Sequence, residues 1–570
     1  QSTNSWRDSS GRRLAPSSAP PLKPGHVQSE GSSSRGCMAS WTGLSPLWGT
    51  FDPKELASRR MSGVAANANV RTWRAGEDEC EGLQEGDVVG KFGEKFIWER
   101  GHRTAAQLAP LRRLGDLRAD ALLDRVSAKQ GLGAANDAFE EDIFELIQSG
   151  GAAASDPMAK DFLAHYSTPP SWLDESKLQR GQGVFVRYLP AAGATLYYVS
   201  LVGGFSAPLV TKVLRATGYL TAAAPRVARR LAETGHMICD CLLDGALTPD
   251  SAGWKAVLRV RFLHARVRRA LRGKSYWRDA EWGVPINQED LAVTLLAFSY
   301  NVLVGIELIG GEPLGREDQE AYIHLWRYIG WLMGVEEENN PCESPSGAKA
   351  WLESIVMHIL EPDADSVAVA HHLLRAPRPT FGVAFRMEVC RRFLGDSLAD
   401  ALHLPYASRS NAIYATLYFI SLRAYTFLAR IPVLGPLLDR FHLYCVRRAI
   451  QTLPASASSP AASLPPSSFT HITASPNAHL EIGSDGVPSP VRRSLWGVPA
   501  AIGAIGGVGA VGTGSPVGGG CPMRALAGAL VEEEASRRKA GVGEDVATPG
   551  CPFGKRAGGE GGSAETAGKD

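Results

Sequence analysis

Apolar residues recur at helical spacing along most of residues 76–450, and this spacing restricts the fold more than any other feature of the sequence. For example, Ala119, Leu122 and Val126 fall on one side of a helix that Asp116 is well placed to cap. Alternation of apolar and polar residues, the pattern of a half-buried strand, is scarce. The sequence therefore predicts an all-α domain over this stretch.

Several further helices can be placed by their periodicity and by their first residues. Pro225 is suited to the first position of a helix. Asn287 resembles a helix cap, with acidic Asp290 three positions later. The expected helices are 139–149, 225–243, 291–306 and 316–335.

Two stretches of biased composition flank the helical region. Residues 1–75 are rich in Ser, Arg, Pro and Gly, and residues 451–570 are rich in Pro, Ala, Ser and Gly. Both offer few large apolar groups to offset the entropy of ordering, so we expect disorder there. Cys521-Pro and Cys551-Pro resemble haem-regulatory dipeptides, but chance in such a composition explains them better.

Composition and charge exclude some classes of function. The 570 residues are 44% hydrophobic and 21% charged, which suits a globular protein with a sizeable core. The net charge of +1 gives no overall attraction to nucleic acid or to an anionic membrane. Residues 259–272 are basic, but apolar core positions interrupt them, so we expect no nucleic-acid role.

Cysteine usage and the first residues bear on the cellular compartment. The nine cysteines are scattered, odd in number and without a CxxC pair, so neither a disulfide framework nor a structural zinc site is expected. Reduced cysteines in an intracellular protein are the default expectation. The chain begins at Gln1, and residues 1–48 show no signal-peptide pattern, although a removed targeting segment stays open.

Residues 188–211 contain no charged residue and are long enough to cross a bilayer. Pro190, Pro208 and the pair Gly203-Gly204 interrupt them, which favours a buried central helix with a break. The apolar run 413–422 suits either the core or a membrane surface. Peripheral membrane association therefore stays open.

The segment 253–271 carries the first candidate for chemistry. His264 falls on the apolar stripe of this helix, with Arg261 and Arg268 one turn before and after it. A neutral imidazole in an apolar interior is what a haem iron needs as an axial ligand, and the cations are able to pair with haem propionates. The alternative is a histidine satisfied within the core. The stripe consists of Val260, Leu263, Val267 and Leu271.

The helix 225–243 carries the second candidate. Arg230 and Thr234 are one turn apart and share a face. Gly235 in mid-helix costs about 1 kcal/mol relative to Ala, which either a flat group such as a porphyrin or close helix packing would explain.

Together these motifs form an ordered series that resembles the rubber oxygenase (latex-clearing protein) and MpaB-type oxygenase family. The resemblance covers about residues 90–450. Its motifs are Gly115-Asp-Leu-Arg-Ala-Asp120, Arg230-x-x-Glu233-Thr234, His264-Ala-Arg-Val-Arg268, Trp282-Gly-Val-Pro-Ile-Asn-Gln-Glu-Asp-Leu291 and His324-Leu-Trp-Arg-Tyr-Ile-Gly330.

The resemblance implies a globin-like helical core around haem b. It implies that His264 is the proximal iron ligand, and that Arg230 and Thr234 line the opposite, distal side. The implied activity is that of a dioxygenase, the cleavage of carbon–carbon double bonds in an isoprenoid or similar small apolar substrate by O₂.

The sequence departs from the family pattern at two places. Leu117 stands where the family has Pro, and Glu233 stands where the rubber oxygenase has a Lys able to reach the iron. Glu233 is therefore a candidate base or a group that tunes the iron, and the alternative is that it points away and pairs with Arg229 or Arg230. Two rival functions stay open: a haem-binding peroxidase-like or sensor protein, and a haem-free lipid-binding scaffold. The oligomeric state is open, and the other candidate histidines are His236, His324, His358 and the pair His371-His372.

Overall fold

The structure, a computed structural model, describes residues 71–72, 83–129, 143–148, 153–217, 224–243, 245–376 and 381–452. Every described residue lies in one unit of the chain. The predictions of disorder at the two ends, and the two Cys-Pro dipeptides, therefore fall almost wholly outside the described residues.

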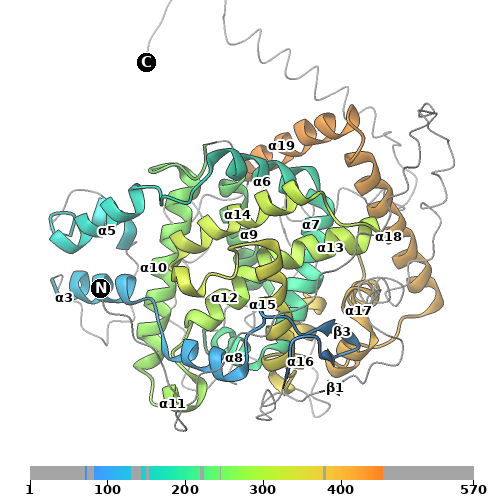
Figure 1. Ribbon diagram of the computed structural model, residues 1–570, viewed down its shortest axis with the longest axis horizontal. Coiled ribbons are helices and arrows are strands. Elements are labelled where there is room, and N and C mark those ends of the chain that lie inside the picture. The colour runs from blue at the N-terminus through green and yellow to red at the C-terminus, as the bar shows by residue number, and fades with distance from the viewer. Residues whose placement is uncertain are drawn as a thin grey trace, which may run out of the picture. The chain divides into compact units, whose positions relative to one another are not determined.

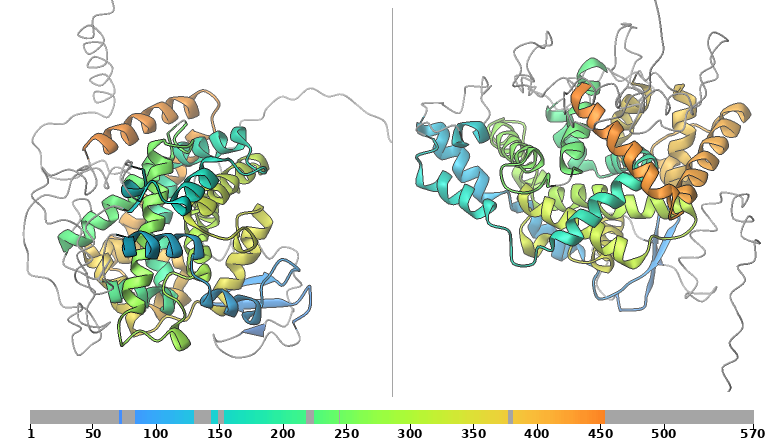
Figure 2. Two further views of the ribbon diagram at one scale, coloured as in Figure 1. Left: turned by 90° about the vertical axis from the view of Figure 1, so that its left-hand side faces the viewer. Right: turned by 90° about the horizontal axis from the view of Figure 1, so that it is seen from above.

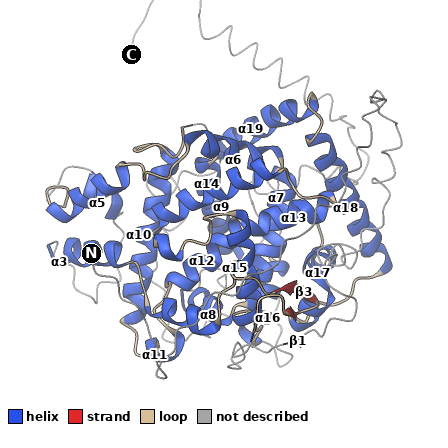
Figure 3. Cartoon of the chain, viewed as in Figure 1, coloured by secondary structure: helices blue, strands red, loops and turns tan. Residues whose placement is uncertain are grey.

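Helices make up nearly all the regular structure of the described residues, so the predicted all-α class is confirmed (Figure 3). The globin-like arrangement of the core stays a prediction. The helices in the first half are α2 (Ala105–Leu108), α3 (Leu117–Lys129), α4 (Ile143–Gln148), α5 (Pro157–Ser167), α6 (Glu175–Arg187), α7 (Leu189–Thr195), α8 (Pro208–Thr217), α9 (Ala224–Cys241) and α10 (Ala252–Arg272). The later ones are α11 (Asp279–Trp282), α12 (Gln288–Phe298), α13 (Tyr300–Gly310), α14 (Arg316–Met333), α15 (Pro345–His358), α16 (Ala364–Arg375), α17 (Val383–Ala401), α18 (Arg409–Ala429) and α19 (Leu434–Thr452).

A small sheet of three short strands accompanies the helices and was not predicted (Figure 1). Strand β1 (Arg71–Thr72) pairs in parallel with β2 (Val88–Lys91), which pairs antiparallel with β3 (Glu94–Ile97). The sheet packs on α15 through Phe96 and Met357. Strands this short give too few alternating positions to be seen in a sequence.

The helix starts follow the expected capping residues. The Asp116 carboxylate accepts a hydrogen bond from the Ala119 backbone N–H at 3.2 Å, as a cap of α3 does. Asn287 and Asp290 form a reciprocal capping box at the start of α12. The predicted helix 291–306 is instead two helices, because Ser299 has a non-helical backbone (φ −100°, ψ −89°) between α12 and α13.

The uncharged stretch 188–211 is the buried, broken helix that its Pro and Gly residues predicted. All of α7 is buried, and it continues into a wider π-helix over Leu196–Val202. The chain then bends by 101° before α8. In the described residues, Gln288–Gly310 and Arg409–Ala429 are long and apolar enough to cross a membrane, and the bent pair 189–217 would add a third span if it were one. Half of the first stretch is buried inside the protein, against a third of the second.

In the view of Figure 1, helix α10 stands with α3 and α5 on its left and α9, α12 and α14 on its right. It packs against α3, α9 and α14. Trp254 and Phe262 of α10 are both 1% exposed and belong to the main core. Nearby, α6 and α14 lie in very close contact, because an added Cβ at Gly181 would be 2.4 Å from the Ala321 carbonyl oxygen. This packing fixes α10 between two groups of helices.

Candidate functional site

His264 lies in the middle of α10 and is one of two described histidines whose Nδ1 is buried without a hydrogen-bond partner, the other being His371. Burial, followed by the positive charge of Arg268, lowers the pKa of the ring to about 4, so the imidazole is neutral at physiological pH. The ring nevertheless keeps some accessible surface, as do Val260 and Leu263 on the same stripe. This part of α10 is therefore less tightly covered than its buried face.

Helix α9 packs against α10 and supplies the second group of candidate residues. Val227, Ile238 and Cys241 of this helix are buried. Glu233 and Thr234 are half-buried in the middle of the helix. Arg230 belongs to the same helix, but its side chain lies outside the described part. The structure thus places the two predicted motifs on neighbouring helices, while their distance from His264 stays untested.

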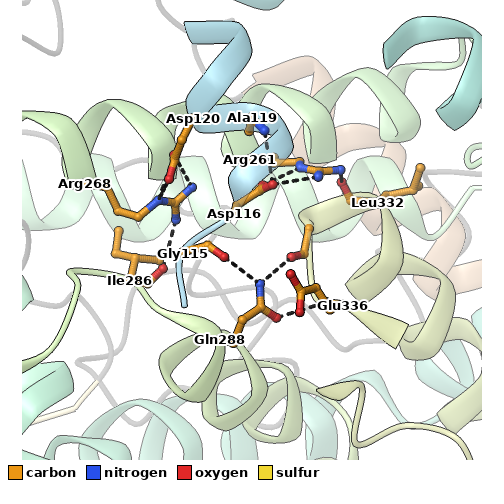
Figure 4. Close-up of polar contacts among 11 residues, drawn as sticks. Gly115, Asp116, Ala119, Asp120, Arg261, Arg268, Ile286, Gln288, Leu332 and Glu336 are labelled. Atoms are coloured by element: carbon orange, nitrogen blue, oxygen red, sulfur yellow. Dashed lines mark hydrogen bonds and ion pairs between the residues drawn. The ribbon is translucent and has the colours of Figure 1, made fainter. Parts of the chain in front are cut away.

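Arg261 forms a buried ion pair with Asp116 (Figure 4). Its Nε and one terminal nitrogen donate to the two carboxylate oxygens at 2.6 and 2.9 Å, a bidentate arrangement. A further hydrogen bond reaches the Leu332 carbonyl oxygen at 3.3 Å. Burial alone would raise the pKa of Asp116, but the charge and hydrogen bonds of Arg261 outweigh it and lower that pKa. The pair joins α10 to the start of α3 and to the end of α14.

Arg268 makes a second, similar connection two turns further along α10. Its Nε donates to Asp120 at 2.9 Å, and another nitrogen donates to the Ile286 carbonyl oxygen at 2.9 Å. Burial raises the pKa of Asp120 despite this partner. Both arginines next to His264 thus already pair with carboxylates, so either would have to share its guanidinium with a propionate. Propionate binding by Arg261 and Arg268 stays a prediction.

Gln288, which the sequence analysis did not single out, connects this network to α12 (Figure 4). Its amide nitrogen donates to the carbonyl oxygens of Gly115 and Gly334 at 3.2 and 3.0 Å. Its amide oxygen accepts from the backbone N–H of Glu336 at 3.0 Å. The only sequence signal was its place within the Asn287–Asp290 cap. Gln288 therefore links three segments that are far apart in the chain.

Next to Gln288 stand two buried acids, Glu289 and Asp290. Burial, then the like charge of Glu289, raises the pKa of Asp290 to about 7. Burial also raises the pKa of Glu289. Arg112, whose Nε lies 3.1 Å from the Glu289 carboxylate, acts in the opposite direction and lowers that pKa. Asp290, the acidic member of the α12 capping box, is therefore a group whose charge changes near neutral pH.

The competing histidines have protein partners. His236 lies 3.7 Å from Asp240, and the His324 Nε2 accepts from the Asp174 backbone N–H at 3.0 Å. The His371 Nε2 lies 3.1 Å from the carbonyl oxygens of Leu402 and His403, although its Nδ1 has no partner. His358 packs edge-on against Trp98. In the described part of the chain, no three His, Cys, Asp or Glu residues gather as a metal site would require.

Comparisons with known proteins show what part of this chain is similar to. Residues 188–430 match the family model described as ER-bound oxygenase mpaB/B'/Rubber oxygenase, catalytic domain. The rubber oxygenase of Streptomyces sp. (strain K30) is 26% identical over 216 residues, which are 36% of this chain and 50% of that protein. The chain therefore spans about half the length of this curated relative.

A solved structure of latex clearing protein LCP in the closed state is also similar. It has a TM-score of 0.45 and 21% identity, and the match covers 60% of this chain and 91% of that chain. The match to the family model includes α9, α10 and the paired helices α12 and α13, so this part of the chain is similar to the catalytic domain of the ER-bound oxygenase mpaB/B' and rubber oxygenase family.

Proposed function

We propose that this chain is a haem b-dependent oxygenase that cleaves a carbon–carbon double bond of an isoprenoid, or of another long apolar substrate, with O₂. The observation that carries the proposal is His264, a neutral and half-buried imidazole whose buried Nδ1 has no partner. A buried polar atom without a partner calls for an explanation, and a bound ligand is one. The match of residues 188–430 to an oxygenase family model supports the same conclusion.

The residues fit a haem better than an ion held by protein groups alone. A haem iron needs only one protein ligand, because the macrocycle supplies four nitrogens, and a neutral histidine is the usual choice. His264 would be that ligand, and its low pKa keeps it unprotonated for the role. When bound, the haem would supply a redox-active iron that binds and activates O₂.

The chain's own residues would orient the substrate and exclude water. Val260 and Leu263 on α10, with Val293 on α12, offer apolar surface that is only partly covered. Thr234 and Arg230 on α9 would donate hydrogen bonds to oxygen atoms. In the overall reaction the C=C bond and the O–O bond break and two C=O bonds form, so both oxygen atoms end in the carbonyl products.

The test is an absorption spectrum of the purified protein, oxidised and then reduced with dithionite, beside His264→Ala and the control His371→Ala. We expect a Soret band in the wild type and the control, and its loss in His264→Ala, with far-UV circular dichroism unchanged. His371 is the matched control, because its Nδ1 is also buried without a partner. A folded His264→Ala protein with a full haem spectrum would reject the assignment.

A second candidate function is a haem protein that does not cleave isoprenoids, and Glu233 is the observation that favours it. A half-buried carboxylate on α9 stands where the resemblance to rubber oxygenase would place a lysine. Its negative charge would change the reactivity of a nearby iron. Incubation of the haem-loaded protein with polyisoprene and O₂ separates the two functions, since only the oxygenase forms carbonyl products.

A further inference from the structure

Large apolar side chains that are exposed gather on the outer side of the last two helices. We define the α18–α19 face by Ile413, Leu417, Ile420, Phe427, Leu437 and Tyr444, which are 40% to 59% exposed. Val433, in the turn between the helices, is 74% exposed. Elsewhere in the described residues such side chains are few and scattered, so this face is unusual for a water-facing surface.

The opposite side of the same helices is already buried. Ala415, Phe419 and Leu422 of α18 are at most 3% exposed, and α18 packs on α13 and α17. The exposed residues 413, 417, 420 and 427 follow helical spacing, so they form a second apolar stripe on one helix. A helix that is apolar on both sides is usually covered on both, by protein or by lipid.

Charge indicates which of these covers the face. The stretch 405–452 contains six arginines and one acid, Asp439, which pairs with Arg187 at 2.6 Å. Arg409, Arg440 and Arg447 are exposed. A second copy of the chain would bring the same positive charges to the face, and the segment 453–570 has few large apolar side chains with which to cover it. An anionic lipid surface is complementary in both respects.

The position of α18 also suits a surface rather than a span. Figures 1 and 2 show α18 and α19 at the edge of the described helices, at the end away from α3. The other apolar stretch, Gln288–Gly310, is enclosed by the protein to a greater extent. Arginine and tyrosine side chains near an apolar stripe are the usual anchors at a bilayer interface.

We propose that the α18–α19 face is a membrane-docking surface that inserts into the interface of bilayers containing anionic lipids. The inference goes beyond the proposed function and does not depend on haem or on oxygenase activity. On the opposite side, α19 packs against α9, which carries Glu233 and Thr234. Docking would therefore bring the candidate site within one helix layer of the lipid.

Flotation of the full-length protein with vesicles tests this proposal. The vesicles contain phosphatidylcholine and phosphatidylserine in equal parts, or phosphatidylcholine alone. We expect the wild type to float with the mixed vesicles. The double variant Leu417→Glu with Leu437→Glu should lose about a hundredfold in partitioning, roughly tenfold for each leucine. Leu417→Trp with Leu437→Trp should keep it.

Two further variants sharpen the test. Arg440→Gln with Arg447→Gln should weaken binding to the mixed vesicles by about fivefold for each arginine and leave neutral vesicles unaffected. Leu117→Glu is the matched control, because Leu117 is 67% exposed on α3 at the far end of the helices. It should bind as the wild type does.

Three outcomes would overturn the proposal. One is a folded wild-type protein that floats with neither kind of vesicle. Another is an equal loss of binding in Leu117→Glu. The third is a dimer that Leu417→Glu with Leu437→Glu converts to a monomer without vesicle binding by the wild type, which would assign the face to a second copy.

Discussion

Neighbouring positions on one face of α10 treat their polar side chains in opposite ways. Arg261 and Arg268 are each 2% exposed, and each reaches a carboxylate and a backbone carbonyl (Figure 4). Between them, His264 has a buried nitrogen with no partner. One turn of helix separates arginines paired with carboxylates from an imidazole nitrogen that has no partner.

This difference teaches which residues hold the fold and which are left for a ligand. A buried polar group without a partner costs about 1–3 kcal/mol, so native folds rarely leave one without a reason. The fold pairs Arg261 and Arg268 with carboxylates yet leaves the Nδ1 of His264 without a partner. We infer that the network fixes the rotation of α10 about its axis, and that this rotation presents His264.

The first prediction removes the carboxylate that pairs with Arg261. Asp116→Ala leaves the buried Arg261 without its carboxylate, and an uncompensated buried charge costs about 3–5 kcal/mol. Urea unfolding of the purified variant measures the loss. Asp124→Ala is the control, because Asp124 is 70% exposed and its pairing with Arg269 at 3.7 Å should contribute under about 1 kcal/mol. Equal stability of the two variants would show that the network does not hold α10.

The second prediction concerns the glycine that closes the network. Gly334 has φ +92°, and an added Cβ would lie 2.3 Å from the Asp116 carboxylate and 2.8 Å from the Arg261 Nε. Gly334→Ala should therefore lower the free energy of unfolding by about 2–4 kcal/mol, from backbone strain and crowding together. Gly183→Ala is the control, since Gly183 lies within α6 with open space around it, and it should stabilise by about 0.5–1 kcal/mol. A tolerated Gly334→Ala would mean that the network can shift.

The third prediction uses pH to reach the acid beside Gln288. The pKa of Asp290 is raised to about 7 in the folded protein, above its ordinary 3.8. As pH falls from about 8 to about 5, the native state takes up a proton there and the unfolded state does not, so this residue adds stability as pH falls. Over that window the free energy of unfolding of the wild type should rise by at least about 1.4 kcal/mol more than that of Asp290→Asn, which is the equivalent of one pKa unit. Parallel stability–pH curves for the two proteins would contradict the raised pKa.

Local sequence signals predicted the parts of the fold that local physics decides. Asp116 and Asn287 were recognised as caps because a cap needs only its own side chain and the next three backbone N–H groups. The bend before α8 followed from the Pro and Gly residues of the stretch 188–211. The interruption at Ser299 was missed, because no Gly or Pro marks it. Its backbone angles depend on how α12 and α13 pack, which the local sequence does not show.

The site was harder to predict, because its partners lie far apart in sequence. Arg261 and Asp116 are separated by 145 residues, so periodicity could show two neighbouring charges on α10 but not what they contact. The cations were expected beside a haem, whereas the structure shows them paired with acids of the Gly115–Asp120 motif. Gln288 was missed for the same reason, since its role depends on backbone carbonyls from two distant segments. His264 was singled out by its place on the apolar stripe of one helix, but its assignment as a haem ligand came from the family resemblance and stays a prediction.

The last prediction tests the unpaired residue, His264, and has the smallest expected effect on stability. His264→Leu removes a buried nitrogen that has no hydrogen bond to lose and replaces it with an apolar side chain. The protein without haem should therefore keep its stability, or gain about 1 kcal/mol, while the variant loses haem binding. Urea unfolding of haem-free wild type and His264→Leu measures this, with Asp116→Ala alongside. If His264→Leu lost as much free energy of unfolding as Asp116→Ala, then His264 would support the fold as the arginines do, and the contrast between them would not hold.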